Sequence, residues 1–337
     1  MEKIETVLIA GAGAVGLTVA SSIYEWNAKN IYVLAKGSRL ENYKAKGLYV
    51  NEKRIPFLLA DVDKKDCEPD LIIIACKYHH LKEIISDIKN YVGKNTLILS
   101  LLNGISSEEI IGKEYGKERI PYAMILGTDA QHGNQHTVFK QKGIIFFGDK
   151  LNRSENGKAT SKCPEAVQRI AEFFERAKVP YSIPENMIKK LWFKFMVNVG
   201  INQCSAILKF PYGPFQENGQ PFNVPEARSL MTDAMKEVIA VSKPEGVNLS
   251  ESDMQEWYDC LDGLTPDSCT SMCQDVKAGR KTEVEMFAQT VIELGKKHNV
   301  PTPVNEVLFK QIRMLEASAR IASGKVADVE ENATKGV

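Results

Sequence analysis

The sequence carries no excess charge and no long apolar run. Its 337 residues include 43 Lys and Arg against 43 Asp and Glu, so the formal net charge is +0. Balanced charge gives no bulk attraction to nucleic acid or to an anionic membrane surface. The longest apolar runs, such as residues 71–76, are too short to span a bilayer. The first residues lead almost directly into a strand, without the charged and apolar blocks of a signal peptide. We therefore expect a cytoplasmic protein that binds neither nucleic acid nor membrane.

The sequence also lacks the paired cysteines of a disulfide framework. Its seven cysteines are odd in number and include no Cys-x-x-Cys pair. A chain of this length can build a core without disulfides, so we expect free thiols. Cys269 and Cys273 are four residues apart on an expected helix, but no second pair accompanies them. His132 and His136 share that spacing in an expected loop. We predict no metal site from either pair.

What the sequence does contain is enough apolar and charged residues for a folded protein of two domains. It is 44% hydrophobic and 26% charged, and its length exceeds that of a typical single core. The first half alternates apolar strands with helices, which predicts an α/β, doubly wound, mainly parallel sheet of the Rossmann type. The expected strands are 5–10, 31–35, 47–50, 56–60, 71–76, 97–101, 121–126, 144–148 and 181–183, and the expected helices include 79–92, 105–115 and 163–178.

The second half has an almost wholly helical pattern. We therefore expect a cofactor-binding domain over residues 1–183 and an all-α domain over residues 184–337, with a frayed tail at 324–337. The expected helices are 185–208, 224–243, 251–262, 268–278, 283–298 and 304–322.

A glycine-rich turn follows the first strand and opens a helix. It reads Gly11, Ala12, Gly13, Ala14, Val15, Gly16. In this position Gly11 permits a tight turn, Gly13 lets backbone approach a diphosphate, and Gly16 allows a helix to pack closely on a strand. The pattern predicts a dinucleotide site at the positive end of a helix. The alternative is a glycine-rich turn with no ligand.

The end of the second strand indicates which dinucleotide is bound. NAD sites usually carry Asp or Glu there, for the ribose 2′-hydroxyl. This chain instead has Lys36, Ser38 and Arg39, which suit a 2′-phosphate by charge and hydrogen bonding. Glu41 is nearby but is expected to begin the next helix. We therefore predict NADP(H), as NADPH or NADP+, over NAD(H).

Two polar residues follow later strands of the same sheet. Lys77 comes after residues 71–76, and Asn103 comes after the strand at 97–101. Open α/β sheets bind ligands at the carboxyl ends of their strands, so both could reach the cofactor. Lys77 could equally face solvent, and Asn103-Gly104 is a favoured turn dipeptide anywhere.

Within the helical half, a polar stripe interrupts an apolar segment. Lys194, Asn198 and Asn202 recur at every fourth residue, so a helix places them on one face. Asn is a mediocre helix former, and an ammonium group with two carboxamides suits a polar ligand. The alternative is an ordinary solvated helix face.

Further along, Glu283 lies where a new helix is expected to start. Thr282-x-x-Glu285 fits a capping box, with Gly279 ending the helix before it. In that position Glu283 could simply interact with the helix dipole.

Taken together, these segments resemble the ketopantoate reductase (2-dehydropantoate 2-reductase) family. The resemblance rests on the glycine-rich turn, Cys76-Lys77, Leu102-Asn103-Gly104, Trp192-Phe193-Lys194 with Asn198 and Asn202, Thr270-Ser271-Met272, and Thr282-Glu283. It implies an NADPH-dependent reductase that converts a small 2-oxo acid, ketopantoate, to D-pantoate on the route to coenzyme A.

The resemblance also implies a role for each matching residue. Lys194 matches the lysine that protonates the ketone oxygen, and Glu283 matches the carboxylate that holds the substrate hydroxyl. Ser271 matches a hydroxyl near the substrate carboxylate. Asn198 and Asn202 match asparagines of the substrate pocket, and Asn103 matches the asparagine at the nicotinamide end of the cofactor. We expect burial to lower the pKa of Lys194 and Glu283 to oppose that shift.

Some features depart from the family pattern. Lys36 stands where many relatives have arginine, and the segments 211–224 and 250–266 look longer than in compact members. The exact 2-oxo acid therefore stays open, as does the oligomeric state, for which a homodimer is the candidate. A related reductase of another 2-oxo acid and a non-catalytic NADP(H) sensor are the alternatives.

Overall fold

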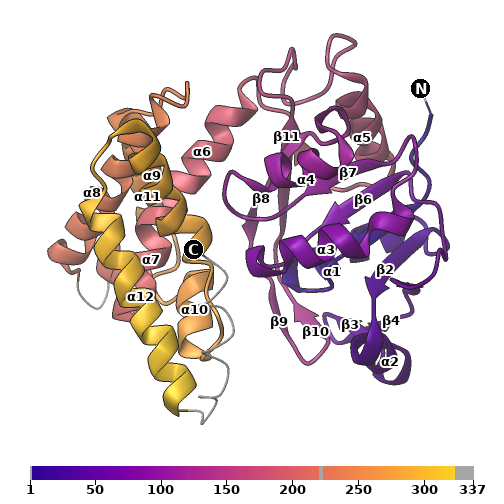
Figure 1. Ribbon diagram of the computed structural model, residues 1–337, viewed down its shortest axis with the longest axis horizontal. Helices are drawn as coiled ribbons and strands as arrows, with labels where there is room; N and C mark the ends of the chain where they lie inside the picture. Colours follow the sequence, from indigo (N-terminus) through magenta and orange to yellow (C-terminus); the bar gives the residue numbers. More distant parts are fainter. Residues whose placement is uncertain (1, 220–222, 323–337) are drawn as a thin grey trace, which may run out of the picture. The chain divides into compact units, whose positions relative to one another are not determined.

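The computed structural model describes residues 2–219 and 223–322 and divides into two compact units, Met1–Leu191 and Trp192–Val337 (Figure 1). The division falls inside helix α6 (Met187–Val197), a few residues beyond the boundary predicted at residue 183. The frayed tail predicted at 324–337 lies outside the described residues. None of the described helices is long and apolar enough to cross a bilayer.

The first unit is built on a five-stranded sheet in which every neighbouring pair is parallel. The strand order is β5 (Leu58–Asp61), β2 (Ile31–Ala35), β1 (Val7–Ala10), β6 (Leu71–Ile74) and β7 (Leu97–Ser100). The connecting helices are α1 (Ala14–Trp26), α2 (Gly37–Lys46), α3 (Leu81–Asp87) and α4 (Ser107–Tyr115), with short 3₁₀ turns η1 (Tyr78–His80), η2 (Lys89–Tyr91) and η3 (Lys117–Arg119). This doubly wound arrangement confirms the predicted fold class.

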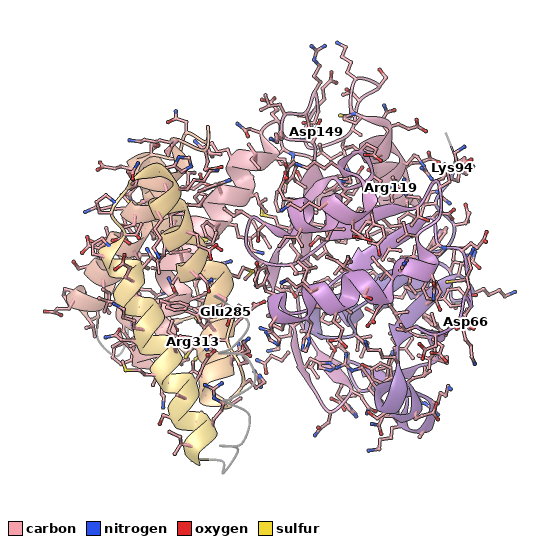
Figure 2. The ribbon with its side chains drawn as sticks, viewed as in Figure 1. Asp66, Lys94, Arg119, Asp149, Glu285 and Arg313 are labelled. Carbon is pink, nitrogen blue, oxygen red and sulfur yellow. The ribbon has the colours of Figure 1, made fainter. Side chains whose placement is uncertain are left out.

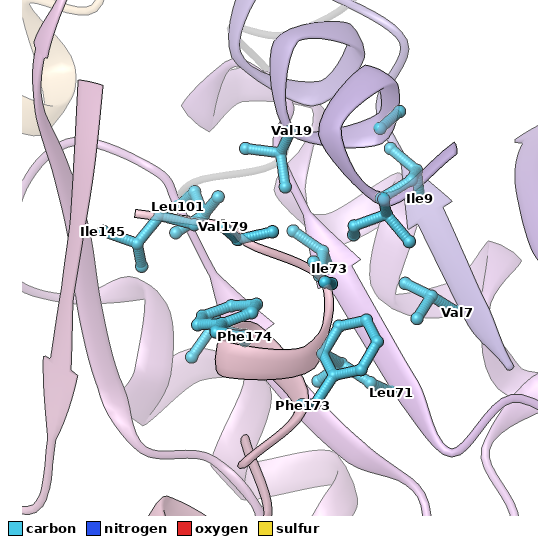
Figure 3. Close-up of a cluster of buried hydrophobic side chains, with 14 of the residues drawn as sticks. Val7, Ile9, Val19, Leu71, Ile73, Leu101, Ile145, Phe173, Phe174 and Val179 are labelled. Atoms are coloured by element: carbon cyan, nitrogen blue, oxygen red, sulfur yellow. The ribbon is translucent and has the colours of Figure 1, made fainter. Parts of the chain in front are cut away.

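Both faces of this sheet are covered. Val7 and Ile9 of β1 belong to one buried cluster, whereas Leu8 belongs to another, because successive side chains point to opposite faces. On the first face, Phe173 and Phe174 of α5 (Glu165–Arg176) lie with sheet residues in one cluster (Figure 3). Each of these fully buried side chains contributes roughly 1.5–3 kcal/mol of transfer free energy. The continuously apolar strands of the sequence are therefore strands buried on both sides.

Two smaller sheets complete the first unit. One has the order β12 (Tyr181–Ser182), β11 (Lys142–Gly148), β8 (Tyr122–Thr128), and the other β4 (Lys53–Ile55), β3 (Leu48–Val50), β10 (His136–Val138), β9 (Gln131–Gly133). The loop predicted around His132 and His136 was wrong, because β9 and β10 form an antiparallel hairpin there. Its turn uses Asn134 and Gln135 with φ of 47° and 68°, a conformation typical of tight hairpins.

The second unit is helical, as predicted. After α6 come η4 (Asn198–Asn202), α7 (Gln203–Leu208), η5 (Gly213–Phe215), α8 (Pro225–Ser242), α9 (Glu251–Asp262), α10 (Ser271–Lys277), η6 (Glu285–Gln289), α11 (Thr290–His298) and α12 (Pro303–Ala322). The predicted helices at 185–208 and 283–298 each contain a π-helical turn, η4 and η6, that the sequence pattern did not indicate.

The π turn η4 occurs where the helix packs closely on α8. A Cβ atom at Gly200 would lie only 2.6 Å from Cγ of Met235, so any larger residue here would require the Met235 side chain to shift. The side-chain amide of Gln203 donates a hydrogen bond of 2.7 Å to the carbonyl of Val199 within the turn. Turns of this kind are frequent at functional sites.

Candidate functional site

The glycine-rich turn is closely packed at two of its three glycines. Gly11 has φ of +120°, and a Cβ there would lie 2.6 Å from the carbonyl oxygen of Ala75. A Cβ at Gly16 would lie 1.9 Å from the carbonyl oxygen of Gly11. These contacts hold the end of β1, the start of α1 and the segment after β6 against one another, as predicted for the first and third glycines.

Gly13 is different because the space beside it is open. No described atom lies within 4 Å of a Cβ placed at Gly13. Gly13 is the N-cap of α1, and among the described residues no side chain caps this helix end. The first turn, Ala14-Val15-Gly16, contains no acidic residue. Backbone amides and the helix dipole are thus presented toward open space, and this turn, with Ala12, fits a diphosphate.

The end of β2 carries the cations predicted from the sequence. Lys36 is the N-cap residue of α2, and Ser38 and Arg39 are exposed in the first turn of that helix. The Lys36 ammonium forms ion pairs with Glu83 and Asp87 of α3, which the sequence did not indicate. The prediction that Glu41 begins the next helix was wrong, because α2 already starts at Gly37.

Lys77 and Asn103 lie just beyond the carboxyl ends of two further strands. Lys77 follows β6 as the N-cap of η1, and Asn103 follows β7; both are half-buried. Because β1, β6 and β7 are adjacent and parallel, these ends share one edge of the sheet with the glycine-rich turn. The location predicted for both residues, at strand ends, is confirmed, whereas their binding roles stay predictions.

In the second unit, the polar stripe follows α6 into the π turn. Lys194 lies on α6, and Asn198 and Asn202 are the first and last residues of η4. Lys194 and Asn198 are half-buried, and Asn202 is 5% exposed. Each four-residue step on an α-helix rotates the side chain by about 40°. The wider π turn counters part of this rotation. Because none of the three side chains is exposed, the stripe is not an ordinary solvated helix face.

Lys194 has the most perturbed chemistry of the stripe. Burial lowers the pKa of its ammonium group to about 8, and the charge of Glu283 opposes this shift. Glu283 is itself buried, with 6% of its surface exposed. The lowering of the Lys194 pKa by burial and the opposing effect of Glu283 are both as expected from the sequence. An amine with a pKa near 8 exchanges its proton at physiological pH, which suits a general acid.

The residue before Glu283 is fixed by a carboxylate on α12. Glu316 Oε1 accepts two hydrogen bonds of 2.7 Å, from the Thr282 backbone amide and from its hydroxyl. Arg313 donates to the other oxygen of Glu316 at 3.0 Å. It also donates to Glu285 at 3.3 Å, and these two side chains are labelled in Figure 2. The capping box predicted at Thr282 is therefore absent from this described segment, since the threonine hydroxyl and Glu285 have other partners. Glu316 was missed because it is distant in the sequence.

Ser271 is the first residue of α10 and is exposed. The preceding Thr270 caps this helix: its hydroxyl accepts from the Cys273 amide at 3.2 Å and donates to the Ser205 hydroxyl at 3.2 Å. Gly279, with φ of +63°, lies just beyond the helix end, as predicted. Both α10 and η6 pack against η4, so Ser271, the two asparagines and Glu283 lie on or beside neighbouring elements.

The two long segments of the second unit contact one another. Gln216 donates hydrogen bonds of 2.8 Å and 2.7 Å to the carbonyls of Leu261 and Leu264.

Within the described residues, no group of three His, Cys, Asp or Glu side chains could hold a metal ion. All seven cysteines are free thiols, as predicted.

Comparison with known proteins identifies the family. Two family models match: "Ketopantoate reductase PanE/ApbA" over residues 7–152, and "Ketopantoate reductase PanE/ApbA C terminal" over residues 186–316. A 2-dehydropantoate 2-reductase of Aquifex aeolicus is 25% identical over 315 residues, which cover 92% of this chain and 96% of that protein. The corresponding enzyme of Pyrococcus horikoshii is 26% identical over 319 residues, covering 92% and 97%.

Solved structures show the same fold at lower identity. A ketopantoate reductase from Ralstonia eutropha JMP134 has a TM-score of 0.78 at 22% identity, covering 94% of this chain and all (100%) of that one. D-mandelate dehydrogenase with NADH and anilino(oxo)acetate has a TM-score of 0.81 at 22% identity, with the same coverage. A dimeric ketopantoate reductase from Staphylococcus aureus has a TM-score of 0.74 at 19% identity, again covering 94% and 100%. The glycine-rich turn, the lysine–asparagine helix and the two matching family models together show that this chain belongs to the ketopantoate reductase family.

Proposed function

We propose that this protein reduces 2-dehydropantoate (ketopantoate) to D-pantoate with NADPH, in the pathway to pantothenate and coenzyme A. Its curated relatives are oxidoreductases that carry this activity in their names. The observation that carries the proposal is the half-buried Lys194, whose pKa is lowered to about 8 and which interacts with the buried carboxylate of Glu283.

The proposed reaction divides between cofactor and protein. NADPH, when bound, supplies the hydride that adds to the carbonyl carbon. The Lys194 ammonium transfers one proton to the ketone oxygen as negative charge develops there, which gives the hydroxyl of the product. The lysine is then a neutral amine and regains its proton from water. A lysine with an ordinary pKa near 10.5 would release that proton less readily.

The other side chains hold the substrate. Glu283 accepts a hydrogen bond from the substrate hydroxyl, and Ser271 donates to the substrate carboxylate. Asn198 and Asn202 line the pocket beside Lys194. Asn103 belongs to the nicotinamide end of the cofactor. These roles follow from the family pattern. The burial of Asn202 and Glu283 supports them, as does the packing of α10 and η6 against η4.

The first unit provides the cofactor site. The open space at Gly13 and the amides of α1 would hold the diphosphate, while Lys36, Ser38 and Arg39 would hold the 2′-phosphate. Lys77 would bind at the same sheet edge. We further propose a homodimer, since one relative with this fold is described as dimeric, and a cytoplasmic location.

Two alternatives remain distinct from this proposal. The first is a related reductase of another 2-oxo acid. The high TM-score with D-mandelate dehydrogenase is the observation that favours this alternative. The second is a non-catalytic NADP(H) sensor, against which the intact set of Lys194, Asn198, Ser271 and Glu283 argues.

One experiment separates the three. The oxidation of NADPH and of NADH is followed with ketopantoate, pyruvate, branched 2-oxo acids and phenylglyoxylate. We expect ketopantoate with NADPH to give the highest kcat/KM. A higher value for another 2-oxo acid would support the first alternative, and cofactor binding without turnover on any of them would support the sensor.

A further inference from the structure

Lys36, at the end of β2, lies between two carboxylates of α3. Its Nζ atom is 2.7 Å from Oε1 of Glu83 and 2.8 Å from Oδ1 of Asp87. The hydrogen bonds that Lys36 donates to Asp87 and, next in size, to Glu83 raise the pKa of Lys36, and the same bond lowers the pKa of Glu83. One ammonium group thus faces two carboxylates, so the formal charge of the cluster is −1.

The cluster lies where the ribose of a dinucleotide is recognised. Lys36 follows the last residue of β2, and β2 neighbours β1, whose carboxyl end begins the glycine-rich turn. In this fold, the group at the end of the second strand binds the ribose 2′ position. The side chains of Lys36 and Glu83 are 42% and 51% exposed, so a ligand in solution can reach them. Asp87 is more enclosed, at 11%.

The carboxylates outnumber the lysine in this cluster. Lys36 is opposed by both Glu83 and Asp87, and Nδ1 of His80 lies 3.5 Å from the second oxygen of Glu83. A ribose 2′-phosphate would bring a charge of about −1.5 to −2 next to both carboxylates. Lys36 has three N–H donors, and the two carboxylates already occupy two of them. A ribose 2′-hydroxyl meets no such repulsion and can donate to a carboxylate.

We propose that Glu83 and Asp87 limit the discrimination of this site between NADPH and NADH, because they compete with the ribose 2′-phosphate for Lys36. This inference rests on the proposed function only in assuming that the glycine-rich turn binds a nicotinamide dinucleotide. It makes the α3 carboxylates determinants of cofactor specificity, although they lie outside the glycine-rich turn and outside the end of β2.

The test measures the Kd of NADPH and of NADH by cofactor fluorescence, without substrate, in the full-length chain. Glu83→Gln keeps the shape of the side chain and removes its charge at an exposed position. We expect it to tighten NADPH binding by on the order of five- to tenfold at low salt, and to leave NADH binding within about twofold. The gain should shrink at high salt, because the groups are exposed. Asp87→Asn should act in the same direction, and Lys36→Gln should weaken NADPH binding alone.

Glu41→Gln is the matched control, since Glu41 is an exposed carboxylate on α2 that pairs with Lys44 instead. An equal gain in this control would show a general charge effect and overturn the proposal. An unchanged ratio of the two Kd values in both Glu83→Gln and Asp87→Asn would also overturn it, while leaving the proposed reaction intact. If neither dinucleotide binds the wild-type chain, both this inference and the proposed function fail. Binding of both without turnover of ketopantoate would count against the proposed function alone.

Discussion

The carboxylate of Glu316 holds Thr282 by two hydrogen bonds of 2.7 Å, one from the backbone amide and one from the hydroxyl. Both residues are buried, so neither donor has an equivalent partner in water. The pair ties α12 to the residue next to Glu283. We therefore regard Glu316 as a positioning residue for Glu283, the side chain proposed to bind the substrate hydroxyl.

Glu316→Ala removes the acceptor for both donors. We expect it to lower the free energy of unfolding by about 1–3 kcal/mol, because it leaves a buried amide unsatisfied. Thr282→Val removes both bonds of the hydroxyl, the one to Glu316 and a longer one of 3.3 Å from the Val284 amide, and should cost about 0.5–1.5 kcal/mol for each. Urea denaturation measures both values. If Glu316 also positions Glu283, its loss raises the KM for ketopantoate while the Kd of NADPH stays the same. An unaltered KM would limit Glu316 to a structural role.

Two glycines of the turn, Gly13 and Gly16, should respond differently to alanine. Gly16→Ala places a Cβ against the Gly11 carbonyl, so we expect destabilisation of about 1–3 kcal/mol or more. Gly13→Ala meets no described atom within 4 Å and should leave the stability nearly unchanged. It should nevertheless raise the Kd of NADPH by on the order of tenfold, or about 1.4 kcal/mol, if a diphosphate occupies that space. Thermal melts with and without NADPH measure both effects. A Gly13→Ala variant that binds NADPH normally would argue against a diphosphate there.

Lys194→Met removes the proposed proton donor but keeps an unbranched side chain of similar length. General acid catalysis contributes about 10²–10⁴-fold, so kcat should fall by this factor while the Kd of NADPH stays unchanged. Lys189→Ala, on the same helix, is the matched control and should retain the wild-type kcat. Turnover at the wild-type rate in Lys194→Met would remove this lysine from the mechanism.

Local patterns predicted much of this fold and part of the candidate site. The four-residue spacing of Lys194, Asn198 and Asn202 predicted that they share one helix face. The spacing of the glycines predicted the close packing at Gly11 and Gly16. Both follow from the backbone over a few residues. The π turn at Gly200 was not predictable in this way, because it coincides with close packing against Met235 on another helix.

The residues that the sequence did not indicate share one property: each lies far along the chain from its partner. Asp87 lies 51 positions after Lys36, and Glu316 lies 34 positions after Thr282. No local periodicity connects such partners, so the sequence indicated Lys36 as a simple cation. The hairpin at His136 was missed because its strands are short and polar, and because β10 pairs with the distant β3.

The pH dependence of kcat/KM tests the role of Lys194 most directly, because it reports the groups of the free enzyme. Reduction needs the ammonium form, so kcat/KM should fall as pH rises through about 8, whereas oxidation of D-pantoate by NADP+ needs the amine and its kcat/KM should rise through the same range. Because Glu283 raises the pKa of Lys194, Glu283→Gln should move the alkaline limb of the reduction to lower pH. A wild-type limb near the ordinary lysine pKa of about 10.4, or a limb that Glu283→Gln leaves in place, would contradict this account.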